Sequence, residues 1–445
     1  MTKISSYTSH AKAFASGEDS PVTFLEASLE AIGKREPVVK AFKAMAIERA
    51  RKEAAESKAR WKRGEPLSPI DGMPVGIKDI LETQDMPTGQ GSPIWEGFAT
   101  RRDSASVQAL REAGALILGK TATTEFASRA QFAETTNPFD PTRTPGGSSS
   151  GSCAAVGAGF VPVALGTQVV GSTLRPASYC GVVGYKPSIG GINRGGSYDY
   201  LSHSCTGVVA TTLDDVWLTT KALVTRTGGD PGFQGVTGPD TPPPSRRPKT
   251  VVVLKTDGWS RATKGARDAL ASACGKLEAA GVNIVTSDGN TDLEAMDAAI
   301  REISALSDVI LGWEGRWPLG SYARTDAEKL HPLTRDRVEK NRSLTQDDYI
   351  AALNFRAALR RRYASLLESA DAVITLAATG AAPAGLESTG DPGFNIPASV
   401  LGVPALSLPV LSDGHMPLGL QLMGRVDDDA DLFAIAGWTM ELFEA

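Results

Sequence analysis

The stretch from residue 145 to 187 constrains the fold most, because it alternates glycine- and serine-rich turns with a short apolar run. It reads PGGSSSGSCAAVGAGFVPVALGTQVVGSTLRPASYCGVVGYKP, with Ser148 after a Gly-Gly pair and Ser172 after Gly171. Glycine lets the main chain adopt a positive φ or come close to a ligand, so the next side chain can be held in a fixed, exposed position. The pattern therefore predicts two serines presented at turns.

Further upstream, the run DGMPVGIKD places Lys78 at the end of a β-branched apolar segment. A strand of this composition would carry the ammonium into the interior, where a lysine tends to lose its proton and can act as a base. We therefore interpret Lys78, Ser148 and Ser172 as one serine–lysine hydrolase site. The alternatives are a surface Lys78 paired with Asp79, a flexible loop around Ser148 and a capping role for Ser172.

These segments resemble the amidase signature family, whose hallmarks are a GGSS-G-S block, a GTD-x-GGS-x-R-x-P block and a lysine on a strand. The resemblance implies Lys78 as the general base, Ser148 as a bridging serine after a cis peptide bond, and Ser172 as the nucleophile. The two serines lie 24 positions apart, as in the family. The segment at 394–425 resembles the family's C-terminal block and reads FNIPASVLGVPALSLPVLSDGHMPLGLQLMGR. The likeness thins between about 225 and 370.

Hydrolysis of an amide requires a nucleophile, a base and donors for the developing oxyanion. We expect Ser148 to pass the proton of Ser172 to Lys78. The donors are expected to be main-chain N–H groups along the turn before the nucleophile, namely those of Val169, Val170, Gly171 and Ser172 itself. Ser149 is expected to support the site through hydrogen bonds or to contact the substrate.

Two departures from the second block concern charge. Gln168 replaces the family's Asp and Leu174 replaces its Arg, and losing both members of an ion pair together avoids an uncompensated buried charge. Arg175 instead follows Ser172 by three positions, a form that resembles a subgroup of malonamidase-like enzymes. That resemblance implies that Arg175, with Gln168, contacts the substrate and binds a carboxylate. An arginine held by backbone carbonyls or by a surface acid is the alternative.

The order of patterns favours an α/β fold, and the resemblance implies a mixed, twisted β-sheet flanked by helices on both faces. We expect a single domain over 1–445 with a more helical, variable, substrate-side region at about 250–370, and a surface linker at 226–249. Expected helices cover 3–18, 20–35, 45–63, 106–113, 260–280, 291–311, 322–341 and 346–369. Expected strands cover 73–81, 115–121, 181–185, 249–255, 283–288, 371–378 and 403–411, with a strand followed by a helix over 208–224.

Composition narrows the class of protein. The chain has 445 residues, 41% of them hydrophobic, so it can bury a large core, and its formal charge of −5 argues against a nucleic-acid partner. No apolar stretch reaches the roughly 18 residues of a membrane span, and the polar N-terminus does not suggest a signal peptide. The four cysteines show no metal-ligand spacing and are read as reduced thiols of a cytoplasmic protein that needs no metal or cofactor.

The sequence thus predicts an enzyme that hydrolyses the C–N bond of a small amide or carbamate (urethane) through an acylated Ser172, and urethanase-like relatives fit this reading. The chain is expected to act as a monomer or homodimer on a small molecule. One alternative is the A subunit of a tRNA-dependent amidotransferase, which the changes at Gln168 and Leu174 disfavour. Another is an inactive binding protein on the same scaffold. A Ser-His-Asp site is the poorer reading, since only His10, His203, His331 and His415 could serve it.

Overall fold

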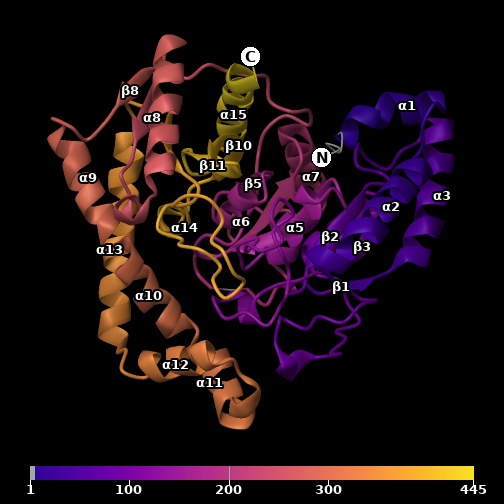
Figure 1. Cartoon of the computed structure of the whole chain (residues 1–445), viewed down its shortest axis with the longest axis horizontal. Coiled ribbons are helices and arrows are strands. Elements are labelled where there is room, and N and C mark those ends of the chain that lie inside the picture. Colours follow the sequence, from indigo (N-terminus) through magenta and orange to yellow (C-terminus); the bar gives the residue numbers. More distant parts are fainter. Residues whose placement is uncertain (1–5, 200, 445) are drawn as a thin grey trace.

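One continuous mixed sheet runs through the molecule, with helices packed on both of its faces (Figure 1). The computed structural model describes residues 6–199 and 201–444. The strands follow the order β1-β3-β2-β4-β6-β5-β10-β11-β9-β7-β8. Their bounds are β1 Phe42–Met45, β2 Pro74–Lys78, β3 Leu116–Thr121, β4 Val163–Gln168, β5 Val183–Lys186, β6 Cys205–Ala210, β7 Thr250–Val253, β8 Asn283–Val285, β9 Ala372–Leu376, β10 Ala405–Asp413 and β11 Met416–Met423.

The α-helices alternate with these strands in the first half of the chain and follow one another in the second half. Their bounds are α1 Ala11–Ser16, α2 Pro21–Val39, α3 Ile47–Arg63, α4 Ala105–Glu112, α5 Ser150–Gly157, α6 Leu174–Tyr179, α7 Leu213–Thr227, α8 Lys264–Ala279, α9 Thr291–Arg301, α10 Ile303–Glu314, α11 Arg316–Thr325, α12 Pro332–Asn341, α13 Gln346–Leu366, α14 Ile396–Leu401 and α15 Asp429–Glu444. Among the described residues, no helix combines the length and apolarity that crossing a bilayer requires.

Strand β2 lies between β3 and β4 and runs parallel to both, with Val75 opposite Ile117 on one side and Val163 on the other. All residues of these three strands are buried, as expected for parallel strands covered on both faces. The carboxyl ends of parallel strands meet at one edge of the sheet. Lys78 is the last residue of β2, and β4 ends four residues before Ser172, so the sheet brings the two segments together.

The GGSSSG turn continues directly into α5, which lies against the main chain of β3. A Cβ atom at Gly151 would come within 2.3 Å of both Ala122 N and Ala41 O. Only glycine therefore allows the first turn of α5 to approach this closely. This contact fixes the helix that follows Ser148.

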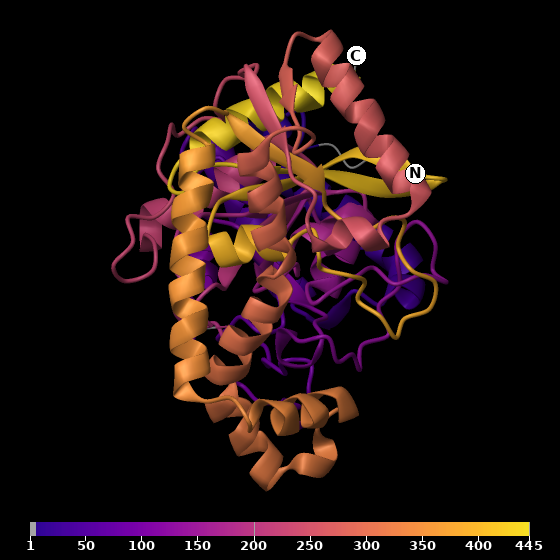
Figure 2. The same cartoon turned by 90° about the vertical axis from the view of Figure 1, so that its left-hand side faces the viewer.

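Helices α10 to α13 form what we call the helical arm (residues 303–366), inserted between β8 and β9. Figures 1 and 2 show α11 and α12 at the end of the arm that lies farthest from α8 and α9. Helices α10 and α13 attach the arm to the rest of the protein. Their buried apolar residues pack with α14 in one cluster, which includes Ile310, Leu359 and Val400. The arm is thus anchored to the sheet at one end.

The structure corrects several expected boundaries. Residues 42–45 pair with β3 as strand β1, so the predicted helix starting at 45 begins too early. The helix expected at 291–311 is two helices, α9 and α10, and that expected at 322–341 divides before α12 because Pro332 starts a new helix at its first position. The helix expected at 3–18 is reduced to a 3-10 turn and α1, and its first residues lie outside the described part.

Candidate active site

Lys78 is completely buried and points at a serine. Its Nζ lies 2.8 Å from Ser148 Oγ and also donates to Thr167 Oγ1 at 2.8 Å and, less closely, to the Thr167 carbonyl oxygen at 3.4 Å. Two neutral oxygen atoms of one residue, Thr167 on β4, therefore hold the amine while it faces the hydroxyl of Ser148. Thr167 has no counterpart in the sequence prediction, although it stands inside the GTQ segment that was singled out.

Burial lowers the pKa of Lys78 to about 7, while the nearby Asp199 and Cys153 act in the opposite direction. Desolvation disfavours the charged ammonium, so a large fraction of Lys78 is neutral near pH 7. A neutral amine has a lone pair that can accept the proton of Ser148. The electrostatics therefore suit Lys78 to the role of a base.

The alternative pairing of Lys78 with Asp79 is wrong. Asp79 instead lies 3.0 Å from Nζ of Lys120, which is also buried and donates to Thr88. The two buried lysines of β2 and β3 thus differ, because Lys120 has a carboxylate partner and Lys78 has none among the described ion pairs. Burial lowers the pKa of both lysines, and the carboxylate of Asp79 opposes this shift at Lys120.

Ser148 follows a cis peptide bond, Gly147–Ser148, as the resemblance implied. The carbonyl oxygen of Ser148 accepts from the N–H of Thr124, and the N–H of Ser149 donates to the carbonyl oxygen of Ser172 at 3.2 Å. The main chain around Ser148 is therefore tied both to the loop after β3 and to the segment that carries Ser172.

Ser172 lies in the short turn between β4 and α6 and is 4% exposed. None of the described hydrogen bonds uses its hydroxyl, nor the main-chain N–H groups of Val169, Val170, Gly171 and Ser172. The turn at 169–172 therefore presents four consecutive main-chain N–H donors without acceptors beside the hydroxyl of Ser172. Such a turn can accommodate an oxyanion.

Gly171 has no room for a side chain. A Cβ atom there would come within 2.8 Å of Asn395 Oδ1 and 2.9 Å of Arg175 Nη1, and both of these buried atoms are without a hydrogen-bond partner in the described structure. Asn395 is otherwise fixed, because its Nδ2 donates to Gln421 and to the Ala377 carbonyl. Neither Asn395 nor its proximity to the turn was anticipated, since it lies far away in the sequence.

Arg175 is buried and bound mainly by backbone carbonyls, the alternative that the sequence had left open. Its guanidinium donates to the carbonyl oxygens of Thr389 and Gly147 and to Thr389 Oγ1. Burial lowers the pKa of Arg175 to about 10. One nitrogen, Nη1, remains unpaired beside Gly171. Arg175 therefore braces the turn before Ser148 and directs one further donor toward the neighbourhood of Ser172.

Gln168 and Ser149 are occupied by partners within the protein. Gln168 Oε1 accepts from the N–H groups of Thr173 and Leu174, and its Nε2 donates to Ser399. Ser149 Oγ donates to the Thr167 carbonyl and accepts from the Thr167 N–H. Gln168 thus caps the start of α6, while Leu174 is buried among apolar residues. The contacts give both polar side chains a supporting role.

A buried carboxylate, that of Glu125, joins the helical arm to the loop that follows β3. Glu125 accepts from Ser92 Oγ at 2.9 Å, from the His331 N–H at 3.2 Å, and from Thr334 Oγ1. His331 is the N-cap residue of α12, and its own side chain accepts from the Leu333 N–H. Glu125 holds this start of the helix through the His331 N–H and the Thr334 hydroxyl, which lie 206 and 209 positions away in the sequence. The sequence prediction did not single out Glu125, because its partners come from a region of no recognisable motif.

The remaining candidates do not converge on the serines. His203 is fully buried, and burial together with nearby Arg356, Arg360 and Lys186 lowers its pKa to about 3, so it stays neutral. Cys180 is buried, and burial raises its pKa. Among residues 6–199 and 201–444, no cluster of three or more His, Cys, Asp or Glu is placed to hold a metal ion.

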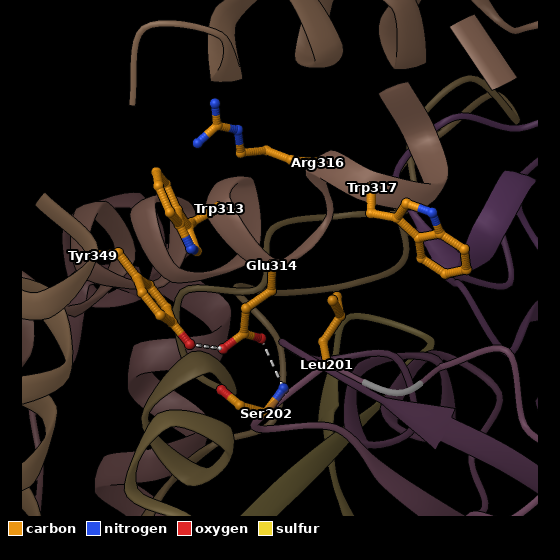
Figure 3. Close-up of a pocket in the computed structure, with 7 residues that line it drawn as sticks. All are labelled: Leu201, Ser202, Trp313, Glu314, Arg316, Trp317 and Tyr349. Atoms are coloured by element: carbon orange, nitrogen blue, oxygen red, sulfur yellow. Dashed lines mark hydrogen bonds between the residues drawn. The ribbon is translucent and has the colours of Figure 1, made fainter. Parts of the chain in front are cut away.

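A pocket of about 550 Å³ opens on the helical arm, apart from Lys78, Ser148 and Ser172 (Figure 3). Glu314 lies at its base, where its carboxylate accepts from Tyr349 Oη at 2.9 Å and from the Ser202 N–H at 2.7 Å. Trp313 and Tyr349 stack with ring centroids 5.7 Å apart. These contacts connect the arm to the segment after Asp199.

Known proteins resemble this chain over almost its entire length. Residues 23–433 match the family named Amidase. Glutamyl-tRNA(Gln) amidotransferase subunits A from Rhodopirellula baltica and Chloroflexus aggregans are each 32% identical, over 95% of this chain and 93% of theirs. A chain from a vestigial protein complex that reveals the origins of an s-triazine catabolic enzyme is 28% identical, with 98% of both chains covered and a TM-score of 0.85.

A further solved structure is that of the peptide amidase PAM in complex with the competitive inhibitor chymostatin. It is 25% identical, covers 99% of this chain and 98% of its own, and has a TM-score of 0.80. The mixed α/β sheet and the buried lysine beside two serine turns define a class of hydrolases that act on C–N bonds. The chain belongs to the amidase family, whose signature blocks it carries.

Proposed function

We propose that this enzyme hydrolyses the C–N bond of a small amide or carbamate through an acylated Ser172. The observation that carries the proposal is the buried Lys78, whose pKa burial lowers to about 7 and whose Nζ lies 2.8 Å from the hydroxyl of Ser148. A neutral amine in contact with a serine supplies the base that hydrolysis needs without a histidine.

The chemistry follows from these groups. Ser172 Oγ attacks the carbonyl carbon while its proton passes to Ser148 Oγ, and the proton of Ser148 passes to Lys78 Nζ. The N–H groups of the turn at 169–172 stabilise the negative charge that develops on the carbonyl oxygen. The C–N bond then breaks as the proton returns by the same route to the leaving nitrogen. Water cleaves the acyl-enzyme and restores Ser172.

Arg175 supports this site in two ways. Its bonds to the Gly147 and Thr389 carbonyls hold the turn before Ser148, and its unpaired Nη1 is available to a polar atom of the substrate. The helical arm, fastened by Glu125, provides the variable side of the substrate region.

A second candidate is the A subunit of a tRNA-dependent amidotransferase, because the relatives in Rhodopirellula and Chloroflexus bear that name. The changes at two positions disfavour this candidate. Gln168 stands where the family has an Asp and Leu174 where it has an Arg, so the charge next to the proposed nucleophile differs. Glutaminase activity together with co-purifying partner subunits would favour this candidate.

The proposal is tested by incubating the enzyme with amides and carbamates and identifying the acylated residue by mass spectrometry. We expect the acyl group on Ser172 and none on Ser148. Ser172→Ala should lower turnover by roughly 10⁴-fold or more. Acylation at another residue, or turnover that survives in Ser172→Ala, would refute the mechanism. Absence of labelling by a serine-directed probe would favour an inactive protein.

A further inference from the structure

The guanidinium of Arg175 contacts the glycines that precede both serines of the site. Its Nη2 donates to the carbonyl oxygen of Gly147 at 2.7 Å, and Gly147 directly precedes Ser148. Its Nη1 lies beside Gly171, where a Cβ atom would come within 2.9 Å of this nitrogen. Gly171 directly precedes Ser172. One planar group therefore spans the two turns that carry the proposed relay and the proposed nucleophile.

Further contacts fix the orientation of this guanidinium. Its Nε donates to the Thr389 carbonyl oxygen at 2.6 Å, and its Nη2 also donates to Thr389 Oγ1 at 3.2 Å. Thr389 packs on the first turn as well, because a Cβ atom at Gly147 would lie 2.8 Å from its Cγ2. On the second turn, the main-chain N–H of Arg175 donates to the Gly171 carbonyl oxygen at 3.1 Å. The two turns therefore cannot move apart without breaking contacts of Arg175.

The positive charge of Arg175 has no counter-ion. The residue is 2% exposed, and none of the ion pairs found within residues 6–199 and 201–444 includes it. The charge of Asp391 acts on Arg175, but this carboxylate is paired with Arg261 at 2.6 Å. Buried charges are ordinarily paired, because their desolvation is costly. Here an unneutralised cation, with Nη1 lacking a partner, is left beside the turn at which the proposed mechanism forms an oxyanion.

We propose that Arg175 is a positioning residue, which sets the separation of the two serines by bridging the glycines that precede them. Its charge favours the oxyanion at the second of these turns. The inference rests on the proposed function and deepens it, because it assigns Arg175 to the proton relay and to the transition state. The resemblance implied a different role, the binding of a substrate carboxylate. A positioning role affects neutral and anionic amides alike, whereas carboxylate binding affects anionic amides alone.

Steady-state kinetics on two amides tests the positioning role. Butyramide is neutral, and succinamate carries a carboxylate on a chain of the same length. In Arg175→Gln we expect kcat to fall by roughly 10²-fold for both amides while KM changes little. Arg425→Gln is the matched control, because Arg425 also binds two backbone carbonyls, those of Leu367 and Ala370, and its loss should leave kcat unchanged. A fall confined to succinamate would overturn the proposal.

Chemical rescue separates the charge of Arg175 from its shape. Arg175→Ala leaves space for free guanidinium, and urea has the same planar shape without the charge. Guanidinium at low millimolar concentration should raise kcat of Arg175→Ala by roughly tenfold or more, and urea should not. Arg175→Lys keeps the charge but cannot bridge both turns, so its kcat should lie between those of Arg175→Gln and the wild type. An equal effect of the two compounds, or equal rates for Arg175→Lys and Arg175→Gln, would overturn the role of the charge.

A fluorophosphonate probe separates this inference from the proposed chemistry. The serine oxygen forms a bond to phosphorus and fluoride leaves, while the hydroxyl proton passes to the relay, so no amide is involved. Labelling of wild-type Ser172, slowed by roughly tenfold or more in Arg175→Gln, would support the proposal. Equal labelling rates would overturn the inference and leave the proposed function standing. A wild type that is neither labelled nor active on amides would instead refute the proposed function.

Discussion

Lys78 Nζ and Thr167 Oγ1 lie 2.8 Å apart, on the neighbouring parallel strands β2 and β4. The threonine hydroxyl accepts one hydrogen of the amine and so leaves the side facing Ser148 for proton transfer. The sheet itself therefore orients the amine that we propose as the base. Because the contact depends on the register of two buried strands, it is fixed before any substrate arrives.

Removing the hydroxyl of Thr167 should slow catalysis without unfolding the protein. Thr167→Val keeps the shape of the side chain but leaves the buried amine with one fewer partner, so kcat should fall by roughly 10- to 100-fold. Thr167→Ser keeps the hydroxyl and should retain most of the activity. Steady-state kinetics with circular dichroism distinguishes the two effects, and equal rates for Thr167→Val and wild type would contradict the role.

Activity should increase as the pH rises through about 7. Burial lowers the pKa of Lys78 to about 7, and only its neutral form accepts a proton. Asp199 raises this pKa, so Asp199→Asn should move the midpoint of the kcat/KM profile to lower pH. A pH series on both proteins measures the midpoints. A profile that is flat across this region, or a shift to higher pH in Asp199→Asn, would count against Lys78 as the base.

Replacing the buried lysine should abolish activity and stabilise the fold. The folded-state pKa of Lys78 lies below that of the unfolded chain, so wild-type stability falls as the pH drops from the ordinary lysine range toward 7 and the penalty is complete below about 7. Lys78→Met should therefore raise the free energy of unfolding by on the order of a few kcal/mol below pH 7. The difference should shrink in alkaline solution. Urea denaturation at several pH values checks this, with Lys62→Met at an exposed position of α3 as the control.

A single methyl group at residue 171 should disturb the turn that precedes Ser172. In Gly171→Ala the new Cβ would meet Asn395 and Arg175 at 2.8 and 2.9 Å, so the N–H groups of the turn must shift. We expect kcat to fall by roughly 10²- to 10³-fold, the usual effect of losing an oxyanion donor. Gly275→Ala on α8, where nothing lies within 4 Å of the added carbon, should have no effect on kcat. An active Gly171→Ala enzyme would show that the turn tolerates displacement.

Breaking the contact between Glu125 and Thr334 should loosen the start of α12. Thr334→Val and Glu125→Gln each weaken a buried, charge-assisted hydrogen bond, and a double-mutant cycle should give a coupling energy of about 1–3 kcal/mol. Hydrogen exchange in residues 331–337 should rise in either variant. Thr325→Val at the end of α11 is the matched control. A coupling energy near zero would mean that the hydrogen bond between Glu125 and Thr334 does not hold the start of α12.

The sequence predicted the fold class and the convergence of Lys78 on Ser148 better than it predicted the bounds of individual elements. Short motifs carry Lys78, Ser148 and Ser172 because glycine turns and a buried strand end leave a local pattern that can be recognised. The α/β class followed in the same way from alternating helix and strand patterns. Strand β1 was missed because three half-buried residues and one exposed residue ahead of a charged helix show no clear periodicity.

Contacts between distant segments could not be derived from local pattern. Thr167 is paired with Lys78 only through strand register, and Asn395 reaches Gly171 only through the packing of α14. Glu125 meets its hydrogen-bond partners only because the loop after β3 packs against the start of α12. Each of these depends on how elements more than 80 residues apart meet, which neither propensity nor spacing encodes.

The helical arm leaves the sheet after β8 and returns at β9, and both strands pair with β7 at the edge opposite to β2. Its insertion points are thus remote from Lys78. A change of length or composition in the arm therefore need not alter the register of β2 and β4, which orients Lys78. Selection could then replace the arm, for which we propose a role in substrate recognition, while the segments that carry Lys78, Ser148 and Ser172 persist. A chimaera that exchanges residues 303–366 with another member of the family should accordingly change which molecules are cleaved and preserve how they are cleaved.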